Sequence, residues 1–166
     1  RLMIASLLSF LIIFILLFQE FKDMKLSAII LLNLPLALIG GVLSIYFTSG
    51  IISIPSIIGF ITLFGIATRN GILLVSRYAA LKAQGIGIYR TIIEGSKDRL
   101  SPILMTALTA GLALVPLALA GDLPGNEIQS PMAIVILGGL ISSTLLNLLV
   151  IPIVYFLINK KTEKLI

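Results

Sequence analysis

Two polar residues able to do chemistry, Arg69 and Asn70, stand in the middle of the long apolar run 57–75. The residues on both sides are typical of a membrane-spanning helix. A guanidinium near the bilayer centre costs from about 2.5 to above 10 kcal/mol, so an arginine inside a span is by default a candidate functional residue. Arginine keeps its proton at every physiological pH. Arg69 therefore cannot carry a transported proton, but it can lower the pKa of a carboxylate that faces it.

The acids of the chain are in the wrong places to pair with Arg69. All seven lie outside the predicted spans: Glu20, Asp23, Glu94, Asp98, Asp122, Glu127 and Glu163. Removing the partner of a buried charge costs several kcal/mol, so we expect an acidic partner in another part of the polypeptide or in another subunit. Asn70, Thr106 and Thr109 can add neutral hydrogen bonds. The alternative is that Arg69 extends along its long stem to the cytoplasmic interface.

Composition sets the class of the protein. The chain is 58% hydrophobic and 11% charged, whereas a soluble domain carries roughly 25% charged residues, so we predict an integral membrane protein. Cysteine and histidine are both absent, which excludes disulfides, thiolate or imidazole metal sites and Ser-His or Cys-His catalysis within these residues. No phosphate-binding loop or other catalytic motif occurs. We therefore expect no cofactor, no resident metal and no enzyme activity.

The pattern of apolar runs predicts an all-α membrane protein, a five-span helical bundle. The expected spans are about 2–18, 26–47, 55–80, 102–120 and 131–158, each long enough or nearly long enough for a bilayer core of about 30 Å. Apolar residues at helical spacing predict a separate amphipathic helix at about 85–98 on the cytoplasmic membrane surface; a plain solvated linker is the alternative. Ser101 and Pro102 then predict a new helix start, a cap followed by proline.

Small residues mark the expected packing face of the last span. Gly138 with Ser142, and Gly139 with Ser143, form two small-xxx-small pairs. This spacing lets the backbones of neighbouring helices approach closely.

The distribution of basic residues predicts the orientation. One side of the membrane collects ten of them: Lys22, Lys25, Arg77, Lys82, Arg90, Lys97, Arg99, Lys160, Lys161 and Lys164. The positive-inside rule places these connections and the C-terminus in the cytoplasm, and the N-terminus and the loop with Asp122 and Glu127 outside. The net charge of +5 is therefore a topology signal and not a nucleic-acid site. Because the chain starts at Arg1 without an initiator methionine, we expect a fragment of a longer polypeptide.

Three ordered motifs carry a resemblance to a known family. They are GIATRNGILLV at 65–75, RLSPILMT at 99–106 and PGNEIQSPMA at 124–133, with Gly138-Gly139 following. The chain resembles the last transmembrane helices, spans eight to twelve, of the resistance-nodulation-division (RND) efflux pumps, over essentially its whole length. The stretch 127–132 is most similar to their heavy-metal cation efflux branch.

The resemblance implies a much larger protein in the bacterial inner membrane. Members have twelve spans in two six-helix repeats, two large periplasmic inserts and a homotrimeric assembly, which works with a periplasmic adaptor and an outer-membrane channel. A residue matched by Arg69 faces acids of span four that carry the coupling proton. Thr106 matches a threonine of the same network, and Arg99 an arginine at its cytoplasmic mouth. Drug-exporting members typically have lysine at the position of Arg69.

The expected function is therefore a part of a proton-driven exporter of metal cations, with Arg69, Asn70, Thr106 and Arg99 as proton-relay residues. Two alternatives stay open. One is an RND relative that exports drugs or lipids or drives protein secretion. The other is a membrane scaffold without transport, in which Arg69 is structural.

Overall fold

The chain folds entirely into helices, which confirms the all-α prediction. The computed structural model describes residues 2–121 and 123–163, and its helices are α1 (Leu2–Phe21), α2 (Met24–Phe47), α3 (Ile54–Ala83), α4 (Ile88–Leu119) and α5 (Gln129–Glu163). Among the described residues, four helices are long and apolar enough to cross a membrane: α2, α3, α4 and α5 as far as Asn159. The helix α1 occupies the first predicted span, and its crossing of the membrane remains a prediction.

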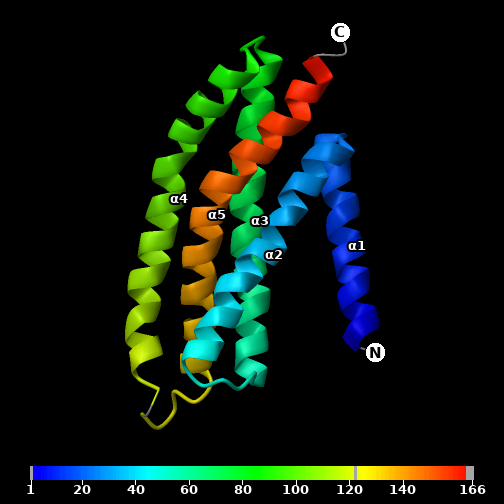
Figure 1. The fold of residues 1–166 in the computed structure, drawn as a ribbon. Coiled ribbons are helices and arrows are strands. Elements are labelled where there is room, and N and C mark those ends of the chain that lie inside the picture. The colour runs from blue at the N-terminus through cyan, green and yellow to red at the C-terminus, as the bar shows by residue number, and fades with distance from the viewer. Residues whose placement is uncertain (1, 122, 164–166) are drawn as a thin grey trace.

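The helices α2 to α5 form a bundle with α1 at its edge (Figure 1). The helix α5 packs against α2, α3 and α4, whereas α1 packs against α2. Two clusters of buried apolar residues hold the bundle together, one shared by α2, α3 and α5 and one between α2 and α3. The larger lies toward the end of the bundle where α3 and α5 terminate and contains Ile29, Ile30, Leu74, Val75, Tyr78, Ile151 and Tyr155. The smaller contains Ala37, Leu63 and Ala67.

Small residues bring the α2 and α5 backbones into contact. A Cβ added to Gly138 would lie 2.7 Å from the carbonyl oxygen of Gly40 and would overlap the side chain of Ser44. One turn farther along α5, Ser142 Oγ donates to the carbonyls of Leu36 (3.4 Å) and Gly139 (3.1 Å). These contacts pair rising α2 numbers with falling α5 numbers, so the two helices run antiparallel.

The second small-xxx-small pair, Gly139 and Ser143, lies beside the first on α5, and Gly139 faces α3. A Cβ at Gly139 would meet Leu63 Cδ1 at 2.8 Å. Ser143 is buried, and its Oγ donates to Leu140 O of the same helix at 3.3 Å. Gly59 similarly lies against Met132 and Val135, so α3 and α5 run parallel.

The helix α4 differs from the prediction, because it is one continuous helix where we expected a surface helix at 85–98 and a separate span from 102. Pro102 lies in its interior, where it cannot donate to the carbonyl of Asp98, a loss that normally breaks or kinks a helix. Contacts with α3 hold the first half of α4 in line. Arg77 pairs with Asp98 at 2.5 Å, and the hydroxyls of Tyr78 and Ser96 lie 2.6 Å apart. Ser101 is therefore an exposed residue inside the helix and not its cap.

Candidate functional site

Arg69 and Asn70 lie near the midpoint of α3 and point to different sides of it. Asn70 is buried at 4% exposure, on the same face as the fully buried Ala67 and Leu74. Arg69 is exposed. Among the described residues no carboxylate forms an ion pair with Arg69. The ion pair that α3 makes within these residues joins Arg77 to Asp98. The guanidinium therefore stands on a bundle surface at mid-helix, free to meet a partner from outside.

Thr106 lies on an exposed face of α4. Its Oγ1 donates to the carbonyl of Pro102 in the same helix at 2.9 Å. No hydrogen bond to Arg69 is recorded for it within the described part of the chain. Thr109, one turn along, is also exposed. Within the residues that the structure describes, these hydroxyls are therefore not joined to Arg69 by hydrogen bonds.

Arg99 is half-buried on α4, directly after Asp98. Its Nε is buried without a hydrogen-bond partner among the described residues. A buried guanidinium N–H left unpaired is costly, so this donor favours an acceptor that residues 2–121 and 123–163 do not supply.

Most of the membrane-length part of α4 is uncovered. Only Thr91, Gly95 and Ile103 are buried along the whole helix. Its large exposed apolar side chains include Leu104, Met105, Leu108, Leu112, Val115 and Leu119. The exposed Thr106 and Thr109 stand on this same, otherwise apolar helix, and Arg69 stands on its neighbour α3.

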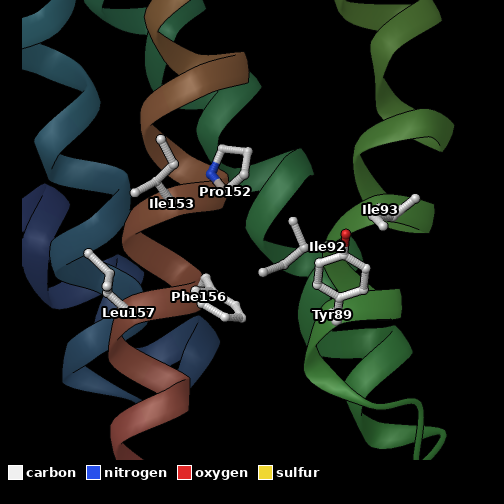
Figure 2. Close-up of a pocket in the computed structure, with 7 residues that line it drawn as sticks. All are labelled: Tyr89, Ile92, Ile93, Pro152, Ile153, Phe156 and Leu157. Atoms are coloured by element: carbon white, nitrogen blue, oxygen red, sulfur yellow. The ribbon is translucent and has the colours of Figure 1, made fainter.

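An apolar groove lies between α4 and α5 (Figure 2). Pro152 and Phe156 of α5 face Ile92 and Tyr89 of α4 across it. The full lining is Tyr89, Ile92, Ile93, Pro152, Ile153, Phe156 and Leu157. Apart from the hydroxyl of Tyr89, these side chains are hydrocarbon and offer no carboxylate, thiolate or imidazole ligand to a cation. Nor does any group of three or more His, Cys, Asp or Glu side chains able to hold a metal ion occur within residues 2–121 and 123–163.

Three buried polar residues were not expected to matter from the sequence. Asn33 and Asn147 are fully buried, and Thr144 is 6% exposed. Like Asn70, both asparagines interrupt apolar runs, and this is the signal that could have drawn attention to them. They lie on the inner side of the bundle, away from the surface that carries Arg69.

Comparison with known proteins places these observations in a family. The model of the AcrB/AcrD/AcrF family matches residues 1–159. The chain is 39% identical over 163 residues to the cobalt-zinc-cadmium resistance protein CzcA of Cupriavidus metallidurans, covering 98% of this chain and 15% of that protein. It is 38% identical over 165 residues to the nickel-cobalt-cadmium resistance protein NccA of Alcaligenes xylosoxydans xylosoxydans, covering 99% of this chain and 15% of that protein.

A solved structure has the same arrangement of helices. The crystal structure of a heavy metal efflux pump, in its crystal form II, superposes with a TM-score of 0.86 at 37% identity. The match covers 96% of this chain and 16% of that chain. The sequence thus spans about one sixth of the length of the proteins that it matches.

Proposed function

The chain belongs to the AcrB/AcrD/AcrF family of RND transporters, and from this premise we propose that it forms part of a proton-driven inner-membrane pump that exports metal cations. Because the chain spans 15–16% of the length of these relatives, we place the other spans and the periplasmic domains in the remaining polypeptide. The complete protein would act as a homotrimer with a periplasmic adaptor and an outer-membrane channel. In this proposal the N-terminus of the chain is periplasmic and its C-terminus cytoplasmic.

The observation that supports coupling to protons is the exposed Arg69 at the midpoint of α3. A permanent charge on that surface is costly in a membrane unless an opposite charge meets it. The acids among the described residues lie at helix ends, in the connections or in the first third of α4. We place the missing carboxylates in the absent half of the transporter, facing Arg69.

The charge of Arg69 then responds to the protonation of its partner. While the carboxylate is ionised, the guanidinium stabilises it and lowers its pKa. When a proton arrives, the attraction is lost and the two helices that carry the groups are free to separate. Arg69 itself stays protonated throughout, so it positions and tunes the proton carrier.

Thr106, Arg99 and Asn70 have supporting roles in this proposal. Thr106 offers a hydroxyl on α4, the helix next to the one that carries Arg69. The Nε of Arg99, unpaired among the described residues, offers a donor nearer the cytoplasmic end. Asn70 faces the interior and holds the α3 turn that presents Arg69.

Metal cations are the proposed substrates because the relatives named above are resistance proteins for cobalt, zinc, cadmium and nickel. No metal-binding cluster lies in the described residues, so we place substrate binding in the rest of the protein. Export of drugs or lipids, or a role in secretion, is the second candidate, and a scaffold without transport is the third.

The test is the Arg69→Ala variant of the full-length transporter in proteoliposomes with an imposed pH gradient. We expect metal-driven proton flux and metal export to fall to background, with expression and trimer formation unchanged, because loss of one partner of a buried pair costs about 3–5 kcal/mol. Arg69→Lys, which keeps the charge, is the matched control and should retain part of the flux. Thr106→Ala should give a partial loss and Arg99→Ala a weaker one.

The outcomes separate the candidates. Near-normal export by Arg69→Ala would contradict the coupling role. Proton flux driven by organic compounds but not by metal cations would favour the second candidate. Absence of any proton flux in the wild-type protein would favour the scaffold.

A further inference from the structure

A polar pocket lies where three of the membrane-length helices meet at one end of the bundle. Its lining comes from the start of α2 and from the ends of α3 and α5: Asp23, Leu26, Ala79, Lys82, Ala83, Tyr155 and Asn159. We call it the end pocket. Its volume is about 270 Å³, several times the roughly 30 Å³ that one water molecule occupies in the liquid. The end pocket therefore has room for a small polar group.

The end pocket lies at the level of the lipid headgroups. The stretches able to cross a membrane begin at Met24 in α2 and end at Ala83 in α3 and at Asn159 in α5, and the pocket lining includes or adjoins all three limits. The 30 residues of α3 extend over about 45 Å at 1.5 Å per residue. This length equals the thickness of a bilayer including its two headgroup layers, about 40–45 Å. A pocket at the end of α3 is thus level with one of these layers.

The end pocket carries one charge of each sign. Asp23 caps α2, where its Oδ1 accepts from Lys25 N at 2.8 Å. Lys82 Nζ donates to Asn159 Oδ1. No ion pair joins Asp23 to Lys82 among the residues that the structure describes. A carboxylate has further lone pairs and an ammonium further N–H donors, so both groups can bind a ligand between them.

Contacts within the bundle hold these two groups in place. Asn159 Nδ2 donates to Tyr155 O at 2.9 Å, which orients the amide oxygen that accepts from Lys82. Tyr155 is 1% exposed and belongs to the larger apolar cluster. On the opposite wall, Ser27 Oγ donates to Asp23 O at 3.1 Å. The walls of the end pocket are therefore parts of packed helices.

We propose that the end pocket binds a zwitterionic group with a primary ammonium and a phosphate, the chemistry of phosphoethanolamine. Lys82 would bind the phosphate, because a lysine ammonium binds phosphate as a point charge. Asp23 would accept hydrogen bonds from the ammonium of the ligand. A purely anionic group would be repelled by Asp23 and a purely cationic one by Lys82, whereas a zwitterion pairs with both.

The bound group would connect the α1–α2 connection to the ends of α3 and α5. Asp23 belongs to the first of these, and the hydrogen bond from Lys82 to Asn159 already joins the other two. The site does not contain Arg69 and requires no proton transport, so it stands apart from the proposed function. The same chemistry occurs on a membrane lipid and on free phosphoethanolamine, and the experiment separates these two sources.

The test measures ligand binding to the delipidated full-length transporter by native mass spectrometry. The lipid probes have the same acyl chains and differ in headgroup: phosphatidylethanolamine, phosphatidylcholine and phosphatidylglycerol. Free phosphoethanolamine is the soluble probe. We expect phosphatidylethanolamine to bind about tenfold more tightly than phosphatidylcholine, whose trimethylated ammonium has no N–H to donate to Asp23. Phosphatidylglycerol, which has no ammonium, should also bind more weakly.

Two substitutions assign the two halves of the ligand. Asp23→Asn removes the charge but keeps a side chain that caps a helix equally well, so it should abolish the preference for phosphatidylethanolamine over phosphatidylcholine. Lys82→Gln should weaken both lipids by about tenfold, because both contain the phosphate. Lys25→Gln is the matched control, since it removes an exposed charge on α2 that does not line the pocket. It should leave affinity and preference unchanged.

The outcomes are distinct. Binding of free phosphoethanolamine with the same dependence on Asp23 and Lys82 would support the site and identify a soluble ligand. Binding of the lipid alone with that dependence would support the site and identify a lipid headgroup. Equal affinity of the wild type for the three lipids would overturn the proposal, as would an equal loss in Lys25→Gln. An unchanged preference in Asp23→Asn, which retains the helix cap, would overturn it as well.

Discussion

At the scale of single residues, the adjacent Arg69 and Asn70 work on different surfaces of α3. Successive residues of an α-helix project about 100° apart, at 3.6 residues per turn. Asn70 is buried with Ala67 and Leu74, and Arg69 is exposed. Reading both as one polar pair is natural from the sequence, because a string of letters does not say which face of a helix is covered. The structure therefore separates Asn70, which is buried and positions α3, from Arg69, the exposed candidate coupling residue.

A residue-scale prediction concerns Gly138. The Gly138→Ala substitution should destabilise the full-length protein by about 1–3 kcal/mol, because the added methyl would press on the Gly40 carbonyl and on Ser44, and backbone cannot move aside cheaply. The measurement is thermal unfolding in detergent. Gly87→Ala, in the connection between α3 and α4, is the control, since nothing lies within 4 Å of its added Cβ and its φ of −58° suits alanine; it should change the stability by less than about 1 kcal/mol. Equal effects of the two substitutions would argue against close α2–α5 packing.

At the scale of the helices, the junction of α3 and α4 depends on packing more than on charge. Arg77 donates from Nε (2.9 Å) and Nη2 (2.5 Å) to one oxygen of Asp98, Oδ2, but the two side chains are 35% and 47% exposed. An exposed pair contributes between about 0 and 1 kcal/mol. Gly95, in contrast, lies flush against the buried ring of Tyr78, where an added Cβ would approach Cδ1 to 2.6 Å.

This contrast predicts the effect of two substitutions. Gly95→Ala should lower the free energy of unfolding by about 1–3 kcal/mol, as overpacking does in a tight core. Arg77→Ala should lower it by no more than about 1 kcal/mol. Denaturant or thermal unfolding of the purified transporter, at low and high salt, measures both. A larger loss for Arg77→Ala that disappears in high salt would mean that the ion pair holds α4 in line.

The sequence predicted the existence of the helices well, but their boundaries and their mutual contacts less well, for one physical reason. Apolar runs of membrane length mark helices such as α2 and α5 without reference to neighbours, and the resemblance motifs place them in a family. Whether α4 is one helix or two depends on its packing against Tyr78, which lies on α3. The burial of Asn33 and Asn147 likewise depends on which helices cover them, and the sequence alone does not show this.

At the scale of the whole molecule, the chain presents the charge of Arg69 without a carboxylate paired to it among the described residues. The described helices leave most of α4 uncovered and Arg69 exposed, while the chain spans 15% of its curated relatives. The proposed coupling therefore belongs to the interface between this chain and the rest of the transporter. A test must therefore detect the proposed carboxylate, which lies in the rest of the transporter, through a substitution made in this chain.

A carbodiimide, which reacts with protonated carboxyl groups in apolar surroundings, provides such a report. Arg69 favours the ionised form of its proposed partner and lowers that pKa. Arg69→Ala should therefore raise the partner's pKa, so that the group stays protonated to higher pH and is modified at neutral pH where the wild type resists. Mass spectrometry of the full-length protein across a pH series locates the modified acid and its midpoint.

Arg77→Ala is the control for this last prediction, because it removes a basic residue whose partner, Asp98, lies within this chain and is largely exposed. It should leave the modification midpoint of the buried acid unchanged. An unshifted midpoint in Arg69→Ala would mean that no carboxylate senses this guanidinium, and Arg69 would then serve packing or the lipid interface. A shift toward higher pH in Arg69→Ala alone would connect the charge in α3 to a proton carrier that this sequence does not contain.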